Sequence, residues 1–169
     1  SGAGTDPECP NDLNGEITLT PANGTATYNY DWDNGTTTGS GAGTSITGLG
    51  AGTYDITITD AVNCTATSSV TLTDPASIVL TCSEQSSTTT IGGNDGVGNV
   101  NITGGTAGFT IDWTGPSSGS QAGNAGSNSI NGLAAGTYNV TVTDANNCTE
   151  TCSFTINDPP CTLTVSGNG

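Results

Sequence analysis

The chain has 169 residues, fifteen of them Asp or Glu and none Lys, Arg or His, so its formal net charge at pH 7 is −15. Because no side chain can neutralise a phosphate, we expect no nucleic-acid partner, and an anionic membrane surface is disfavoured for the same reason. Catalytic triads, Schiff bases and phosphate clamps are excluded as well, since they require His, Lys or Arg. No apolar run approaches the ~20 residues of a membrane span, so we expect no membrane insertion.

Short runs in which apolar and polar residues alternate recur along the chain, separated by Gly, Asn and Ser. Such runs predict half-buried β-strands, and no helical periodicity competes with them, so the predicted class is all-β. The sequence Asp-Asn-Gly at residues 33–35 predicts a hairpin turn. The runs cover residues 16–20, 27–32, 54–59 and 70–72, and then 100–102, 109–113, 138–142 and 154–156.

One stretch occurs twice: residues 48–65 and 132–149 share thirteen of eighteen positions. Each copy contains a strand, a strand with Trp, a Gly/Ser-rich loop, a strand that begins with the sequence GLxAGTY, a turn that ends in Cys, and a final strand before Asp-Pro. This order predicts tandem antiparallel β-sandwich repeats of about seven strands. We expect the hydroxyls of Tyr54 and Tyr138 to pin a corner, and Leu133, Tyr138, Val140 and Val142 to be buried.

The Asp-Pro pairs predict three segments. Residues 1–75 form a first repeat whose first strand is missing or donated, because no strand is predicted before Cys9. Residues 76–160 form a second repeat. Residues 161–169, which begin CTLTV, are the first strand of a following repeat or a donor strand for the next subunit. Either the sequence is a window of a long tandem array or it is a donor-strand subunit, and both make a linear fibre.

Six cysteines indicate a small exported domain stapled by disulfides. Cys64 and Cys148 occupy equivalent turns, and Cys9 and Cys82 lie near the starts of their copies, so we predict the bonds Cys9–Cys64 and Cys82–Cys148. We further predict a bond between Cys152 and Cys161, which flank the second Asp-Pro pair. A metal site is the alternative, but no CxxC pair and no His accompanies these cysteines.

These motifs, which include CPNDLNGEITL, YNYDW and GLGAGTYDITITDAVNCT, resemble the SprB-type repeat of very large surface proteins of gliding Bacteroidetes. Residues from Cys9 to Pro75 follow the family pattern throughout. The second copy follows it from Ala76 to Pro159, except that Cys82 stands eight residues upstream of the usual cysteine position, which Thr90 occupies. The resemblance implies an exported Ig-like β-sandwich module of a cell-surface adhesin or filament, without catalytic residues.

Carboxylates offer two further candidate sites. Asp31 and Asp33 share one strand face and could form the acid pair of a glycoside hydrolase, although a solvent-facing role explains them better. Oxygen-rich turns could bind Ca²⁺, although an Asp in a turn more often bonds its own backbone. The calcium candidates are Asp60 and Asp144, which occupy equivalent turns, and Asp95, which with Asn94 lies in an oxygen-rich loop. Asn11 and Asp12 lie in another such loop, and no other metal or cofactor is expected.

The sequon Asn-x-Thr is abundant, so glycosylation of the chain is a candidate modification. Trp32, Trp113, Tyr28 and Tyr30 could form a sugar-stacking platform, although alternation places them in the cores. The leading hypothesis is therefore a non-enzymatic, extracellular structural or adhesive module that joins itself end to end in a cell-surface fibre, and the alternative is a carbohydrate-binding module. The glycosylation candidates are Asn23, Asn34, Asn63, Asn101, Asn139 and Asn147.

Overall fold

The computed structural model describes residues 1–162, and this part of the chain consists of strands and connecting turns. No helix in it could span a membrane. The chain divides into two compact units, unit 1 (Ser1–Ala76) and unit 2 (Ser77–Gly169). Unit 1 contains β1 (Gly2–Thr5), β2 (Gly15–Leu19), β3 (Asn29–Asp33), β4 (Thr38–Ala42), β5 (Ser45–Leu49), β6 (Gly52–Thr59) and β7 (Thr65–Leu72). Unit 2 contains β8 (Val79–Ser86), β9 (Gly96–Thr103), β10 (Phe109–Thr114), β11 (Gly119–Gly123), β12 (Gly126–Leu133), β13 (Gly136–Thr143) and β14 (Thr149–Ile156).

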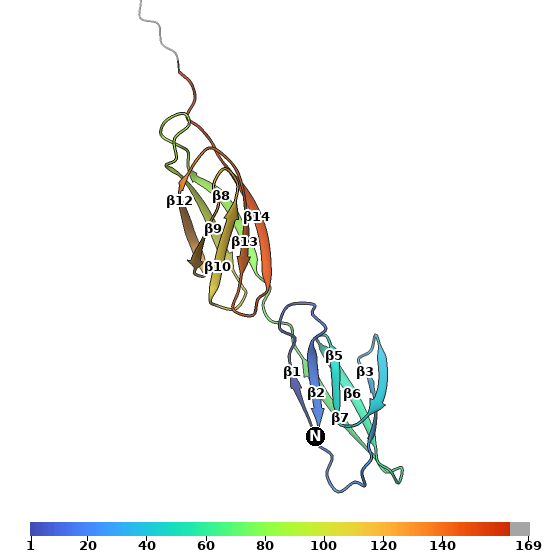
Figure 1. Cartoon of the computed structure of the whole chain (residues 1–169). Coiled ribbons are helices and arrows are strands. Elements are labelled where there is room, and N and C mark those ends of the chain that lie inside the picture. Colours follow the sequence, from blue (N-terminus) through green and yellow to red (C-terminus); the bar gives the residue numbers. More distant parts are fainter. Residues whose placement is uncertain (163–169) are drawn as a thin grey trace, which may run out of the picture. The chain divides into compact units, whose positions relative to one another are not determined.

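Both units follow one strand plan, visible in Figure 1. Unit 1 has a three-stranded sheet, β1-β2-β5, and a four-stranded sheet, β4-β3-β6-β7. Unit 2 has the corresponding sheets β8-β9-β12 and β11-β10-β13-β14. Every strand pairing is antiparallel. The predicted all-β class with two antiparallel sandwiches is therefore confirmed.

The core of each unit lies between its two sheets, where alternate residues of each strand point inward. The repeated stretch supplies much of it, because Leu133, Tyr138, Val140 and Val142 are all buried as predicted. Leu133, however, ends β12 in the three-stranded sheet, whereas the other three residues lie on β13 in the four-stranded sheet. The unit 1 core consists of Ile17, Leu19, Ile46, Leu49, Tyr54, Ile56 and Leu72.

A tyrosine closes the same corner in each unit. The Tyr54 hydroxyl donates a hydrogen bond to the carbonyl oxygen of Gly50 at 2.9 Å, and the Tyr138 hydroxyl donates to that of Ala134 at 3.2 Å. Both rings are buried, so each hydroxyl needs a partner, and the carbonyl four residues upstream provides it. The predicted corner role of both tyrosines is confirmed.

The segments predicted as Gly/Ser-rich loops form edge strands instead. Gly39 of β4 pairs with Trp32 of β3, and Gly119 of β11 pairs with Trp113 of β10. A Cβ on Gly39 would lie 2.5 Å from the Trp32 ring, and one on Gly119 would lie 2.3 Å from the Trp113 ring. The glycines are therefore required because an indole covers each of them, and the cross-strand contact offsets the low strand propensity of glycine.

The prediction that the first repeat lacks its first strand is wrong. Gly2–Thr5 form β1, which pairs with β2 as β8 pairs with β9. The sequence Gly-Ala-Gly-Thr carries no apolar alternation, so periodicity could not reveal this strand. The predicted first strand of a following repeat, residues 161–169, lies outside the described residues apart from its first two.

The predicted disulfide pairing is also wrong. Cys82 of β8 is bonded to Cys152 of β14, with a Cα–Cα distance of 6.0 Å, so neither Cys82–Cys148 nor Cys152–Cys161 forms. Cys64 and Cys161 are exposed free thiols, which excludes Cys9–Cys64. The physical reason is topological: β8 and β14 are edge strands of the two sheets of unit 2, and the observed bond joins those edges.

Unit 1 has no cysteine at the corresponding edges. Cys82 is paired in register with Val100, and the corresponding pair in unit 1 is Gly2 with Leu19. A Cβ on Gly2 would lie 3.5 Å from the Ser68 hydroxyl of β7, so Gly2 and Ser68 stand where unit 2 has its disulfide. The staple is therefore a property of unit 2.

We predict that the double variant Cys82→Ser/Cys152→Ser lowers the free energy of unfolding of unit 2 by about 4 kcal/mol, because the bond closes a long loop in the unfolded chain. Denaturant unfolding in a Trp32→Phe background, where Trp113 fluorescence reports unit 2, measures the change. Cys64→Ser is the control and should stay within about 0.5 kcal/mol of the parent, since its thiol is exposed. An equal loss in unit 1, read from Trp32 fluorescence in a Trp113→Phe background, would contradict the assignment.

Candidate functional site

Two of the three calcium candidates have the same structural role. Asp60 is buried, and its carboxylate accepts backbone N–H bonds from Thr25 (3.0 Å), Cys64 (2.8 Å) and Val62 (3.0 Å). These bonds, those from Thr25 and Cys64 foremost, hold the pKa of Asp60 below its usual value against the opposing effect of burial. The carboxylate thereby closes the turn before β7 and ties it to the loop after β2.

Asp144 repeats this arrangement in unit 2, with bonds from Thr106 (2.9 Å), Asn146 (2.9 Å) and Cys148 (3.0 Å). The third candidate, Asp95, accepts bonds from the hydroxyl and the backbone N–H of Thr89, which lower its pKa. Within residues 1–162 no group of three or more carboxylate or thiol side chains is arranged to hold a metal ion. Calcium binding stays a prediction, and Ca²⁺ would compete with these hydrogen-bond donors for the carboxylate oxygens.

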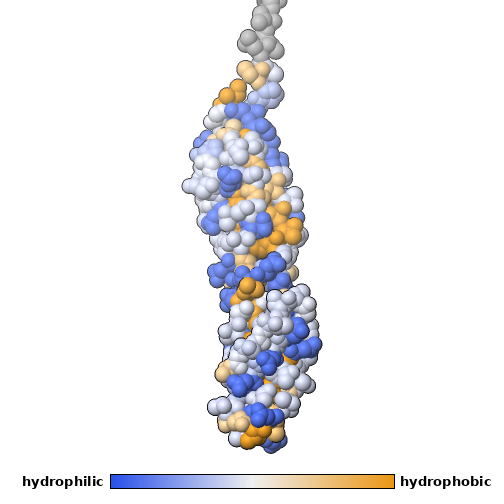
Figure 2. Space-filling model, turned by 90° about the vertical axis from the view of Figure 1, so that its right-hand side faces the viewer, coloured by the Kyte–Doolittle hydropathy of each residue, from blue (hydrophilic) through white to orange (hydrophobic). Residues whose placement is uncertain are grey.

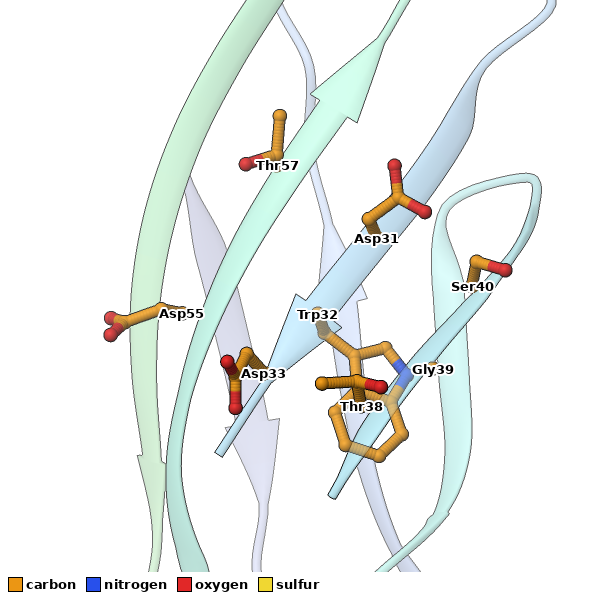
Figure 3. Close-up of a pocket in the computed structure, with 8 residues that line it drawn as sticks. All are labelled: Asp31, Trp32, Asp33, Thr38, Gly39, Ser40, Asp55 and Thr57. Carbon is orange, nitrogen blue, oxygen red and sulfur yellow. The ribbon is translucent and has the colours of Figure 1, made fainter. Parts of the chain in front are cut away.

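A polar pocket of about 480 Å³ lies on the outer face of β4, β3 and β6. Asp31 and Asp33 share this face, as predicted, with Asp31 paired to Ser40 and Thr57 across the sheet. Asp33 faces Asp55 directly on β6, so two carboxylates oppose each other there. Figure 3 shows these side chains around the opening; the lining residues are Asp31, Trp32, Asp33, Thr38, Gly39, Ser40, Asp55 and Thr57.

Unit 2 has less charge at the corresponding place. Asp112 corresponds to Asp31, but Thr114 faces Asn139 where unit 1 has Asp33 facing Asp55. Asp31 and Asp33 are both exposed, whereas the acid of a glycoside hydrolase is kept protonated by an apolar environment. The site favours a solvated acidic face over an acid pair.

The aromatic candidates do not form one open platform. Trp32 and Tyr30 pack against the unit 1 core, and the Trp32 ring meets Tyr54 edge-on at 5.3 Å between centroids. Trp113 is half-buried over Gly119. On the face in Figure 2, hydrophilic and neutral residues dominate, and hydrophobic residues form small separate patches.

The glycosylation candidates differ in exposure. Asn34 and Asn101 are half-buried, and the Asn34 side-chain oxygen accepts the backbone N–H groups of Thr36 and Thr37. Glycosylation stays a prediction for all six residues. The exposed candidates are Asn23, Asn63, Asn139 and Asn147.

A second pocket, the end groove, opens at one end of unit 1 between its two sheets and has a volume of about 510 Å³. Sequence reasoning missed it, because its walls come from segments far apart in the chain. The free Cys64 lies at its edge. Its apolar lining includes Leu19, Tyr28, Ile56, Ile58, Val62 and Ala66.

These features define an all-β protein of antiparallel sandwiches, and the geometry that its two units share lies in cores and turns. Residues 1–37 match the family model described as SprB repeat, which confirms the predicted resemblance over that segment. No curated protein sequence matches the chain.

Three solved structures are similar at low TM-score. The FN1–FN3 domains of chicken CNTN1 match at 9% identity and TM-score 0.36 over 88% of this chain, which spans 62% of theirs. Murine CEACAM1b matches at 14% identity and TM-score 0.37, covering 89% of this chain and 95% of its own. Fibronectin(III)-like modules of Clostridium thermocellum CbhA match at 14% identity and TM-score 0.36 over 100% of both chains.

We predict that Asp55→Asn stabilises unit 1 by about 0.5 kcal/mol, because it removes a like-charge pair with Asp33 across the strands. The gain should shrink as NaCl is raised, since salt screens the repulsion. Thermal unfolding at low and high salt measures it. Asn139→Asp in unit 2, which faces the uncharged Thr114, is the matched control and should cost less than Asp55→Asn gains.

Acid should destabilise unit 1 through Asp60. Because its folded pKa lies below the ordinary aspartate pKa of 3.8, its contribution is complete above about pH 4 and is lost as pH falls through the folded pKa. Asp60→Asn should therefore lower the unfolding midpoint at pH 7 and weaken its fall below pH 4. Asp31→Asn, on the exposed face, serves as the control. An acid-induced fall that is identical in Asp60→Asn and the parent would contradict this role.

Proposed function

We propose that the chain is a non-enzymatic, extracellular structural or adhesive module that joins itself end to end in a cell-surface fibre. The observation that carries the proposal is that both units have the same strand plan. The side chains that the two units share pack in the cores, close the tyrosine corners or hold turns by hydrogen bonds, and they do not form a cluster of reactive groups. The SprB match and the Cys82–Cys152 bond support export, because disulfides persist in oxidising compartments.

The alternative, a carbohydrate-binding module, has less support. Sugar-binding platforms need an open aromatic face, and the Trp32 and Trp113 rings each cover a glycine of the neighbouring strand. The acidic pocket offers hydroxyls and carboxylates, and its one aromatic lining residue, Trp32, is partly buried against the unit 1 core.

Immunogold labelling of intact cells that make the protein tests the proposal. We expect label along thread-like surface structures without permeabilisation, and weaker attachment of cells treated with the same antibody. Label that requires permeabilisation would contradict the proposal. Antibody against a cytoplasmic protein of the same cells is the control.

A further inference from the structure

The end groove of unit 1 is closed in unit 2 by that unit's own chain. In unit 2, Leu80 of β8 pairs with Ile102, and the preceding Ile78 is buried, with 7% of its surface exposed. In unit 1 the corresponding ladder ends at Ser1, where the Thr20 N–H donates to the Ser1 carbonyl oxygen at 2.8 Å. Among the described residues, nothing in unit 1 occupies the positions of Ile78 and Leu80. The end groove lies where unit 2 has these two side chains.

The register fixes this equivalence. Gly15 and Gly96 each pair with the leucine that ends the next strand of the sheet, Leu49 and Leu133. Each residue of β2 therefore corresponds to the residue of β9 at the same distance from its glycine. The residues of β1 and β8 that pair with them correspond as well, which places Ser1 at the position of Thr81. An extended segment that filled the groove would therefore carry apolar residues one and three positions before that of Ser1.

The sequence of residues 162–169, TLTVSGNG, has this pattern. Its last four residues, Ser-Gly-Asn-Gly, repeat the Ser-Gly-Ala-Gly of residues 1–4, and Val165 and Leu163 stand one and three positions before them. Residues 163–169 lie outside the described part of the chain and enter here through their sequence alone.

The glycines of β1 make the match selective. A Cβ on Gly2 would lie 2.7 Å from Cγ2 of Val70, and one on Gly4 would lie 2.5 Å from Cδ2 of Leu72, so larger residues are excluded at both positions. Gly167 and Gly169 keep glycine at both. β1 itself places no large side chain in the core, since its four residues are Gly, Ala, Gly and Thr.

We propose that residues 162–169 of a second copy replace β1 in unit 1, pairing with β2 and inserting Val165 and Leu163 into the end groove. The exchange is favourable because β1 and the incoming segment make the same backbone bonds, while the incoming segment also buries two apolar side chains. This inference rests on the proposed fibre and specifies its joint.

The two free thiols meet at this joint. In unit 2, a Cβ on Gly105 would lie 2.8 Å from Cγ1 of Ile78 and 3.4 Å from Oδ2 of Asp144, whose other oxygen holds the Cys148 N–H. The chain entering β8 thus passes beside the turn that carries Cys148. Cys64 occupies the same turn in unit 1, and Cys161 lies two residues before Leu163, the counterpart of Ile78.

The joint is therefore closed by a disulfide between Cys64 of one copy and Cys161 of the next. The two thiols release two protons and give two electrons to a disulfide oxidant, which is reduced to two thiols as the new S–S bond forms. Both thiols are exposed in the described structure, as this reaction requires.

Oxidation of the purified chain with oxidised glutathione tests the covalent part. Non-reducing electrophoresis should show a ladder at multiples of 16.5 kDa that collapses on reduction. Cys64→Ser or Cys161→Ser alone should stay monomeric, and a mixture of the two should give dimers and nothing larger. An endoproteinase that cleaves at Asp should release a peptide that joins Cys64 to Cys161; trypsin has no site in this chain.

Matched variants test the register. Leu163→Asp and Gly167→Val should lower the dimer yield at least tenfold, because one puts a charge into the groove and the other puts a side chain against Val70. Thr164→Asp and Asn168→Val, which alter the alternate face of the same segment, should stay within about twofold. Unfolding midpoints of both units should be unchanged in all four variants.

Monomers alone after oxidation, ladders linked through other cysteines, or equal yields for Leu163→Asp and Thr164→Asp would each overturn the inference. Surface fibres that persist in cells with Cys64→Ser/Leu163→Asp would also overturn it while leaving the proposed function intact. Loss of surface label from the unmodified protein would instead refute the proposed function.

Discussion

The absence of any side-chain cation is the constraint on which the rest of the structure depends. A carboxylate in this chain has to be satisfied by N–H and O–H donors of its own surroundings, because no Lys, Arg or His can pair with it. Asp60 and Asp144 show the result, since each binds three backbone amides and thereby fixes the turn that precedes the last strand of its unit. Carboxylates that in most proteins form ion pairs with basic side chains here accept hydrogen bonds from backbone N–H groups. The turns are thereby ordered, but the exposed carboxylates repel one another.

The second constraint is the small size of many side chains, because the few large ones have to cover them. The indoles of Trp32 and Trp113 lie over glycines of the neighbouring strands, so the sheets need few aliphatic residues to exclude water. The sheet edges are then the weak points of each sandwich, because an edge strand leaves one row of backbone N–H and C=O groups unpaired. Unit 2 joins its edges with Cys82–Cys152 and closes its end with Ile78, whereas unit 1 has Gly2 at the edge and an open groove. The two units are alike in strand plan and differ in the disulfide and in the residues at this end.

Much of the fold could be predicted from the sequence. Alternation located most of the strands that supply the cores, and repetition showed that the plan occurs twice. Alternation missed β5 and β12, which contribute Ile46, Leu49, Ile130 and Leu133 to the cores. The corner role of Tyr54 and Tyr138 followed from their place in the repeated stretch. Strands without apolar alternation, such as Gly2–Thr5, could not be predicted, because their glycines are explained by side chains from strands distant in sequence. The end groove escaped for the same reason, since its walls come from several segments of unit 1.

The sequence by itself determined the class, the doubling and the exclusion of cationic chemistry, because composition and periodicity are properties of neighbouring residues. Only the tertiary structure decided which cysteines meet. Equivalent positions suggested Cys82 with Cys148, but a bond needs Cα atoms within about 7 Å, and the sandwich brings the edge strands β8 and β14 together instead. It likewise decided that Asp33 opposes Asp55, since strand register sets that pairing.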